Sequence, residues 1–341
     1  MGSVKDLIVL QPATKPEYGH GIFNFSDRYS VFDWGEMPDT IPLKGAATAI
    51  LGAYFFEKLE SRGYETHYAG LVEDGKTMPV SMLAGPSASM KVDLVNVCYP
   101  SVEDGVYDYS EFRKLDFNVL IPLEIIYRNF LPEGSSVFKR LSKGEITYAD
   151  LKLDKNPVPG THLHTPFIDF STKLEITDRY ISDAEAKHIS GLTEEEMETI
   201  SVLTRGINNL ITKEYKKINA VNLDGKIELA RNEQGEIVLV DVLGTLDECR
   251  FELNGLPLSK EVARMYYRNS DWYHETERAK EQDRQNWKKI CKLQPQPLPE
   301  RFKFLLSQMY CKVTNEITER EWFDVPFTLN EIVDEIKTFT R

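Results

Sequence analysis

The sequence lacks any apolar stretch long enough to cross a membrane. No segment of the 341 residues approaches the roughly 20 apolar residues that a membrane-spanning helix needs. The apolar run Leu7–Leu10 is too short for the core of a secretory signal peptide. Cysteine is also scarce, and no Cys-x-x-Cys pair is present among Cys98, Cys249, Cys291 and Cys311. Free thiols in a reducing compartment are therefore expected, and the sequence predicts a cytoplasmic protein with no membrane partner.

Positive charge is in short supply as well. The chain has 41 Lys and Arg residues against 54 Asp and Glu residues, a formal net charge of −13. A general nucleic-acid-binding protein needs a broad basic surface, so no nucleic-acid partner is predicted. A few basic side chains in a cleft can still bind a small phosphorylated substrate, and a divalent cation can offset clustered carboxylates.

The familiar motifs of several enzyme classes are missing. There is no Walker loop, Rossmann fingerprint, Gly-x-Ser-x-Gly elbow or metalloprotease motif. Internal repeats and low-complexity tracts are absent too, while 41% hydrophobic and 28% charged residues are typical of a globular protein. The function must therefore be sought in residues that are dispersed along the chain.

The order of predicted elements is strands first, a mixed middle and a helical tail. Two capping signals, Ser182 with Glu185 and Thr193 with Glu196, predict two helices broken near residues 190–191. The other expected elements are strands at 7–10, 21–25, 91–98 and 119–130, a helix at 46–59, a hairpin at 226–230 and 236–242, and helices from 259 onward. This order predicts an α+β fold. We divide it into a β-rich lobe on the nucleotide side (1–120), a central lobe with metal and substrate residues (121–258) and a C-terminal helical region (259–341).

The predicted hairpin carries an alternating set of charges. Its first strand contains Asp224, Lys226 and Glu228, separated by small or apolar residues, so the three side chains share one face. Asp241, at the end of the second strand, can join that face. Facing carboxylates repel unless a lysine or a cation lies between them, and Mg²⁺ is normally held by carboxylates together with substrate phosphates. The pattern alone fits the solvated face of a surface hairpin slightly better.

Glu124 and Arg128 lie on one alternating face of the otherwise apolar strand at 119–130. Buried charges must be paired or must serve a ligand, because burying them alone is costly. An internal salt bridge and a ligand site are equally compatible with this pattern.

Two further segments place polar groups next to predicted elements. Lys44 and Gly45 come directly before a helix, whose N-terminus can receive an anion, although ordinary capping explains them equally well. Asp247 and Arg250 follow the hairpin, and the planar guanidinium of arginine is a natural partner for phosphate or carboxylate.

Hydroxyl groups and a lysine, in the segment 170–175, follow a segment that we expect to be a loop. That loop holds His162 and His164. A His-x-His pair on a strand can bind a metal, but no third ligand is nearby, so exposed loop histidines are the expectation.

Taken in chain order, these segments resemble the SAICAR synthetase family over about residues 20–290. The family's Ile-Pro-Leu-Glu-Val-Ile-Val-Arg-Gly corresponds to 121–129, its Asp-Thr-Lys-Phe-Glu-Phe to 224–229, and its Leu-Val-Asp-Glu-Val-Leu-Thr-Pro-Asp-Ser-Ser-Arg-Phe to 239–251. Its Ala-Thr-Asp-Arg-Ile-Ser-Ala-Phe-Asp, Ile-Pro-x-Lys-Gly and Pro-Ser-Thr-Lys correspond to 25–33, 41–45 and 170–173. One such motif is a weak signal, whereas six in the right order are a strong one.

The resemblance implies an α+β fold with an ATP-grasp- or kinase-like nucleotide site between a small N-terminal sheet and a larger lobe. It also implies an ATP-dependent ligase of purine biosynthesis. ATP would phosphorylate the carboxylate of a carboxyaminoimidazole ribonucleotide, and the amine of aspartate would then displace the phosphate to form an amide. The implied partners are small molecules, namely ATP, aspartate and the carboxylated imidazole ribonucleotide, with Mg²⁺ as the metal. Such phosphoryl transfer depends mainly on positioning and charge neutralisation.

The resemblance assigns a role to each matching residue. The catalytic residues are Lys226, Glu228, Asp241 and Lys173, among which Glu228 and Asp241 would hold Mg²⁺. The substrate-binding residues are Arg128, Ser136, Asp247, Arg250, Ser30 and Asp33, with Arg128, Ser136 and Arg250 on the ribose phosphate. The residues expected to bind ATP are Lys15, Lys44 and Lys226.

The chain departs from the family pattern at the predicted nucleotide site. The family opens with a Gly-Lys-x-Arg strand over the ATP phosphates, which is not found here. The segment 7–18 offers Lys15, but Pro12 and Pro16 remove backbone donors that such a strand needs.

Other departures lie near the predicted metal and substrate residues. Val242 stands where the family has an acidic residue, and Glu248 and Cys249 replace two serines. These departures keep two alternatives open: a paralogue that amidates or phosphorylates another carboxylated nucleotide, and a catalytically silent nucleotide-binding protein. The sequence also leaves the oligomeric state open, a homo-oligomer included.

Overall fold

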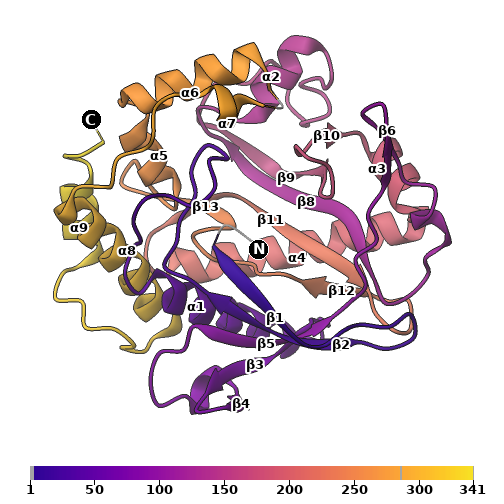
Figure 1. The fold of residues 1–341 in the computed structure, drawn as a ribbon, viewed down its shortest axis with the longest axis horizontal. Helices are drawn as coiled ribbons and strands as arrows, with labels where there is room; N and C mark the ends of the chain where they lie inside the picture. The colour runs from indigo at the N-terminus through magenta and orange to yellow at the C-terminus, as the bar shows by residue number, and fades with distance from the viewer. Residues whose placement is uncertain (1–3, 285, 341) are drawn as a thin grey trace.

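The computed structural model describes residues 4–284 and 286–340, which form two antiparallel sheets and a set of helices (Figure 1). The N-terminal sheet has the strand order β1-β2-β5-β3-β4. Its strands are β1 (Lys5–Gln11), β2 (Gly19–Phe25), β3 (Tyr68–Glu73), β4 (Lys76–Met78) and β5 (Ser89–Leu94). Helix α1 (Lys44–Glu60) packs against this sheet, and most of its residues are apolar and buried because α8 covers its other side.

The larger sheet has the order β10-β9-β8-β11-β13-β14, with β12 paired to the far half of β11. Its strands are β8 (Val119–Leu131), β9 (Thr161–Thr172), β10 (Tyr180–Ile181), β11 (Val221–Arg231), β12 (Ile237–Val240), β13 (Cys249–Leu253) and β14 (Leu256–Leu258). A separate two-stranded hairpin is formed by β6 (Ser101–Glu103) and β7 (Val106–Asp108). The short 3₁₀ turn η1 (Val80–Met82) joins β4 to β5, and η2 (Phe112–Lys114) precedes β8. The two sheets touch through two short bridges, Thr66 with Leu239 and Asn96 with Val119.

Helices cover the larger sheet on one face and complete the molecule at its C-terminal end. Helix α4 (Glu194–Lys216) lies against β8, β9 and β11, and Figure 1 shows it running behind these strands. The other helices are α2 (Ser136–Lys143), α3 (Asp183–Ser190), α5 (Glu261–Tyr267), α6 (Asp271–Gln282), α7 (Trp287–Ile290), α8 (Glu300–Thr318) and α9 (Leu329–Ile336). Helix α8 packs on α1, so the C-terminal helices brace the N-terminal sheet. No helix in the described ranges is long and apolar enough to span a membrane.

Several predicted elements are confirmed at the level of individual signals. Ser182 caps α3, and Thr193 with Glu196 forms a capping box at the start of α4. The hairpin is the antiparallel pair β11 and β12, in which Glu228 pairs with Val240. The mixture of two antiparallel sheets with packed helices is the expected α+β fold.

The expectation of a loop around His162 and His164 is wrong. Both histidines lie on β9, where His162 pairs with Phe130 on β8. The two histidines are exposed and Leu163 between them is buried, which is the alternation of a strand with one open face. Three alternating residues are too few to separate a strand from a loop by sequence. The strand expected to reach Cys98 also ends earlier, at Leu94.

Candidate active site

Three neighbouring strands, β8, β11 and β13, place their charged side chains on one face of the larger sheet. Backbone pairing sets Arg128 opposite Asp224, and Asp224 opposite Arg250. Because side chains alternate along a strand, Lys226 and Glu228 follow Asp224 on the same face. The predicted common face of these β11 side chains is therefore confirmed. We call Arg128, Asp224 and Arg250 the arginine row.

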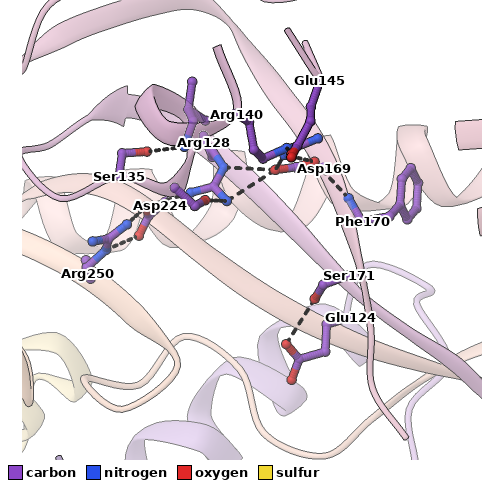
Figure 2. Close-up of polar contacts among 12 residues, drawn as sticks. Glu124, Arg128, Ser135, Arg140, Glu145, Asp169, Phe170, Ser171, Asp224 and Arg250 are labelled. Atoms are coloured by element: carbon purple, nitrogen blue, oxygen red, sulfur yellow. Dashed lines mark hydrogen bonds and ion pairs between the residues drawn. The ribbon is translucent and has the colours of Figure 1, made fainter. Parts of the chain in front are cut away.

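Asp224 orients both arginines of the row. Arg250 donates from Nε to Asp224 Oδ1 at 2.7 Å and from Nη2 to Oδ2. The Nη1 of Arg128 lies 3.7 Å from Asp224 Oδ2, and the Arg128 side chain is only 2% exposed. Figure 2 shows Asp224 between the two guanidinium groups. A paired, bidentate guanidinium has a fixed direction, so its remaining N–H groups are pre-oriented for a further anion.

A second acidic residue supports Arg128 from the other side. Asp169 on β9 accepts from Arg128 Nη2 at 3.2 Å and from Arg140 Nη1 at 2.8 and 2.6 Å (Figure 2). Arg128 Nη2 also donates to Ser136 Oγ at 3.2 Å. Ser136 is the first residue of α2, and the preceding residue Ser135 caps that helix. The structure therefore brings together Arg128, Ser136 and Arg250, which sequence reasoning had grouped, and adds Arg140 and Asp169.

A cavity of about 280 Å³ opens beside β11. We call it the β11 cavity, and its charged walls include Arg128, Asp224, Lys226, Asp247, Glu248, Arg250 and Lys260. Lys260 has no carboxylate within ion-pair distance in the described part of the chain, which leaves its charge available to a ligand. Sequence reasoning missed Lys260, because a single lysine between a strand and a helix carries no pattern.

Lys226 lies among three carboxylates. Its Nζ is 2.7 Å from Glu124, 3.4 Å from Glu228 and 3.3 Å from Glu248. Although burial opposes the charge, the carboxylates of Glu248, Glu124 and Glu228 raise the pKa of Lys226 above its usual range. Lys226 is thus a permanent cation at the centre of the site.

Glu228 and Asp241 come together from the two strands of the hairpin, each beside a lysine. Lys173 Nζ lies 2.5 Å from Glu228, and Lys5 pairs with Asp241. Burial and the nearby charge of Asp241 raise the pKa of Glu228. For Asp241 burial acts in the same direction, but Lys5 and Lys173 outweigh it and hold its pKa below the usual range. The buried Glu228 carboxylate and the half-buried Asp241 carboxylate repel each other, and such a pair forms a site that favours a cation.

The backbone of Asp241 is held in an unusual conformation. Its φ is 65°, in the left-handed region that few residues other than glycine adopt. The ring of the buried His67 fixes the turn, since His67 Nε2 lies 2.9 Å from the carbonyl oxygen of Asp241. Burial lowers the pKa of His67, so the ring is neutral and donates this hydrogen bond.

Asp178 is an acidic residue that sequence reasoning missed. It lies between β9 and β10, exposed to solvent on one side. Partial desolvation of its carboxylate raises the pKa of Asp178 to about 6. The charge of Glu124 adds to this shift, while Lys226 and Lys173 oppose it. An acid that titrates near pH 6 beside the lysines of the site is suited to accept a proton. Its neighbours in sequence, Thr177 and Arg179, give no hint of this position.

Lys44 and Asp247, which were predicted to bind ATP and substrate, bind each other. Lys44 Nζ lies 2.5 Å from Asp247, and both side chains are almost fully buried. Tyr310 on α8 donates to the second Asp247 oxygen at 2.7 Å. The ammonium group of Lys44, which was expected to be free at the start of α1, is therefore held in an internal ion pair in the described structure. Asp247 still borders the β11 cavity.

Ser30 and Asp33 lie on the loop that joins β2 to α1. The Asp33 carboxylate is 90% exposed and 4.0 Å from Lys280. Its negative charge also contributes to the raised pKa of Asp178. Ser30 is half-buried between Tyr29 and Val31. The loop is attached to the C-terminal helices by aromatic contacts, such as Phe32 with Tyr273 at 4.6 Å between ring centroids.

The lysine at the junction of the two sheets is Lys5 and not Lys15. Lys15 lies exposed in the turn between β1 and β2, at the far end of β1 from Lys5. Six residue steps along a strand separate the two ends of β1 by about 20 Å. The prediction for Lys15 therefore does not fit the structure, whereas Lys5 reaches Asp241. Lys5 was missed because a lysine at the start of a short edge strand usually faces solvent.

Comparisons with known proteins agree with this arrangement. The sequence pattern of the SAICAR synthetase family matches residues 2–279. A protein of Archaeoglobus fulgidus, described as a candidate phosphoribosylaminoimidazole-succinocarboxamide synthase, is 47% identical over 338 residues, which cover 99% of either chain. The phosphoribosylaminoimidazole-succinocarboxamide synthase of Thermoplasma acidophilum is 30% identical over 325 residues, which cover 92% of this chain and 99% of the relative.

Solved structures show the same fold. SAICAR synthase of Saccharomyces cerevisiae complexed with SAICAR aligns with a TM-score of 0.65 at 21% identity, over 95% of each chain. A SAICAR synthetase in complex with ADP aligns with a TM-score of 0.60 at 20% identity, over 96% of this chain and 99% of the other. The match of sequence pattern, relatives and fold leads to one conclusion: the chain belongs to the SAICAR synthetase family.

Proposed function

We propose that the protein is an ATP-dependent carbon–nitrogen ligase of purine biosynthesis, acting in the cytoplasm. It joins the amine of aspartate to the carboxylate of a carboxyaminoimidazole ribonucleotide through an acyl phosphate. The family membership supports this activity, and the residues of β11 supply the physical account of it.

The spacing along β11 carries the proposal. Asp224, Lys226 and Glu228 occupy three successive positions on one face of the strand. Each step of two residues covers about 7 Å. The arginine row, which is suited to bind a phosphate, therefore lies at one end of this series of β11 residues. A pair of carboxylates that would bind a cation lies at the other end. A ribonucleotide bound by its phosphate at the arginine row would place its carboxylate toward Lys226 and Glu228.

Glu228 and Asp241 fit Mg²⁺ by the chemistry of their donor atoms. Both offer hard carboxylate oxygens, and their mutual repulsion is relieved by a cation. Within residues 4–284 and 286–340, no group of three or more His, Cys, Asp or Glu side chains is arranged to hold a metal. The protein would thus supply only part of the coordination shell and the ATP phosphates the rest, which is how Mg²⁺ is commonly bound. When bound, the ion would neutralise phosphate charge during phosphoryl transfer.

In the first step, a carboxylate oxygen of the ribonucleotide attacks the γ-phosphorus of ATP, and the bond to the β-phosphate oxygen breaks to release ADP. Lys226 and Lys173 lie where negative charge gathers on the transferred group, and both remain protonated. Arg128 and Arg250 hold the ribose phosphate and so fix the direction of attack.

In the second step, the aspartate amine attacks the acyl phosphate, inorganic phosphate leaves, and the nitrogen loses a proton. Asp178 would accept that proton, since its pKa of about 6 leaves it ionised at neutral pH. Lys260, on the wall of the β11 cavity, is available for the carboxylates of aspartate, and Arg264 lies on the same wall, where it pairs with Glu261 at 3.1 Å.

Asp178→Asn should lower kcat about a hundredfold, within the range that general-base catalysis supplies. In the wild type, kcat should rise with pH through about 6, because the raised carboxyl keeps its proton below that pH and cannot act as a base. The variant should lose this rise. The pH profile of kcat at saturating Mg²⁺–ATP is the measurement, and an unchanged low-pH limb in Asp178→Asn would remove the base role.

Lys5→Met should raise the KM for ATP about tenfold while leaving the KM for the ribonucleotide within twofold. Lys5 adds positive charge at Asp241, on the proposed nucleotide side of the site. Lys15→Met is the matched control, since Lys15 lies in the distant turn and should leave both constants unchanged. An equal effect of the two substitutions would contradict the placement of ATP between the sheets.

The proposed function is tested by ADP release from purified protein with Mg²⁺–ATP, aspartate and the carboxylated aminoimidazole ribonucleotide. Turnover should require all three substrates. ADP release that is independent of aspartate would replace the ligase with a carboxylate kinase. A folded protein that binds ATP but is inactive with this ribonucleotide would contradict the substrate assignment.

A second candidate is a ligase of the same fold that acts on another carboxylated nucleotide. One observation favours it: Glu248, in place of a serine of the family pattern, adds a carboxylate to the β11 cavity and lies 3.3 Å from Lys226. A panel of carboxylated nucleotides and nucleosides in the same assay separates the two candidates.

A further inference from the structure

On the reverse face of the sheet, directly behind the arginine row, three residues touch one another across three strands. Backbone pairing aligns Tyr127 on β8 with Gly225 on β11, and Gly225 with Cys249 on β13. Each of the three is the sequence neighbour of a member of the arginine row. In the family pattern quoted above, the same positions are Val, Thr and Ser. The chain therefore departs from the pattern at all three of these positions, which lie together in the structure.

The contacts show why the three residues depend on each other. The Tyr127 side chain is fully buried and reaches across β11, so that its hydroxyl lies 3.3 Å from Cys249 Sγ. This crossing is open only because Gly225 has no side chain. A Cβ at position 225 would lie 2.4 Å from the Tyr127 hydroxyl and 2.6 Å from Cys249 Sγ. A threonine there, as in the family pattern, would force Tyr127 or Cys249 to move.

A polar network joins this contact to helix α4. The Tyr127 hydroxyl accepts from Asn222 Nδ2 at 3.5 Å, and the same nitrogen lies 3.0 Å from Asn208 Oδ1 and 2.9 Å from Thr212 Oγ1 on the helix. Asn208 also exchanges hydrogen bonds of 2.9 and 2.7 Å with Asn129, the residue after Arg128. Burial raises the pKa of Cys249 to about 12, so the contact is between neutral groups.

We propose that Tyr127, Gly225 and Cys249 are positioning residues that set the separation of Arg128 and Arg250 and thereby the fit of the ribose phosphate. Tyr127 spans the middle strand and connects the two outer strands, each of which carries one arginine. Since Tyr127 and Cys249 are buried in a close-packed interior, a side chain forced into this contact displaces them and, with them, one of the outer strands. The arginine on that strand would move with it. The proposal rests on the proposed function only in taking the arginine row as the phosphate site.

The test compares Gly225→Ala, Tyr127→Val and the double variant Tyr127→Val/Gly225→Ala. Gly225→Ala should raise both the Kd for ribose 5-phosphate and the KM for the ribonucleotide about ten- to a hundredfold, because small displacements of positioning groups have effects of this size. The KM for ATP should stay unchanged. In the double variant, valine leaves room for the new methyl group, so most of the lost affinity should return.

Tyr127→Phe and a control separate positioning from stability. Tyr127→Phe keeps the ring but leaves Cys249 and Asn222 without the hydroxyl, and should raise the Kd for ribose 5-phosphate severalfold. Tyr54→Phe removes a hydroxyl that donates to Glu214, between α1 and α4, and should lower Tm without changing that Kd. The proposal is overturned if Gly225→Ala lowers Tm alone, or if Tyr127→Val fails to relieve its effect on Kd.

Calorimetry with ribose 5-phosphate keeps this test independent of turnover. If the wild type releases no ADP with the ribonucleotide, the proposed substrate fails, while the ordering of the Kd values for ribose 5-phosphate among the variants still decides the positioning role.

Discussion

Glu228→Gln should reduce turnover by at least about a thousandfold, equivalent to ~4 kcal/mol of lost transition-state stabilisation. The change keeps the size of the side chain and removes the charge. The residue is 4% exposed, close to Lys173 and in the field of Asp241, so a neutral amide leaves Asp241 as the remaining carboxylate for a cation. Both ATP binding and phosphoryl transfer should suffer, since the metal and the ATP phosphates are bound together.

Thermal stability distinguishes this loss from misfolding. Without ligand, Glu228→Gln removes the repulsion with Asp241 and also the partner of Lys173, two effects of opposite sign. The melting temperature should therefore change little. Mg²⁺–ATP should raise the melting temperature of the wild type, because a ligand that binds only the native state stabilises it, and this rise should shrink in the variant. Glu195→Gln, on the exposed surface of α4, is the matched control and should keep full activity. Near-normal turnover of Glu228→Gln would exclude the metal role.

The candidate site illustrates which contacts can be predicted from sequence. Asp224, Lys226 and Glu228 share a face because the period of a strand is two, and that periodicity is local. Arg128 and Arg250 were grouped correctly through motifs of the family, and backbone pairing places both beside Asp224. The α+β fold likewise followed from the order of elements, each of which has its own local signals.

Other parts of the site arise only when distant segments pack together. Lys5 meets Asp241 across 236 positions of sequence, and Lys44 meets Asp247 across 203. No periodicity or capping signal connects such residues. The two lysines look alike in sequence, each next to a predicted element, yet one pairs with Asp241, a proposed metal ligand, and the other is buried in an internal ion pair. Whether a charge pairs with a ligand or with a neighbouring side chain is decided by the tertiary fold. The sequence could therefore indicate neither the internal ion pair of Lys44 nor the position of Lys5 at Asp241.

Arg250→Met should lower kcat/KM for the ribonucleotide several hundredfold, while the KM for ATP stays within about threefold. The substitution removes a guanidinium that donates two hydrogen bonds to Asp224. It also removes one of the two arginines proposed to bind the phosphate. Truncating one partner of a hydrogen-bonded charge pair in a binding site typically costs 2–5 kcal/mol, and part of that cost is the carboxylate left unpaired.

Three further variants show whether the effect arises from lost phosphate binding or from the carboxylate left unpaired. Arg250→Lys retains a charge but offers no parallel pair of donors, so its kcat/KM should lie between those of the wild type and Arg250→Met. Arg268→Met, at the exposed end of α5, removes an arginine that pairs with Glu261 and should leave all constants unchanged. The double variant Arg250→Met/Asp224→Asn should recover stability without recovering affinity, because phosphate binding needs the guanidinium and not only a neutral site. If instead the double variant regained the affinity for the ribonucleotide, the arginine row would be a structural ion pair, and the phosphate would have to be bound elsewhere in the β11 cavity, with Lys260 as the cation best placed to bind it.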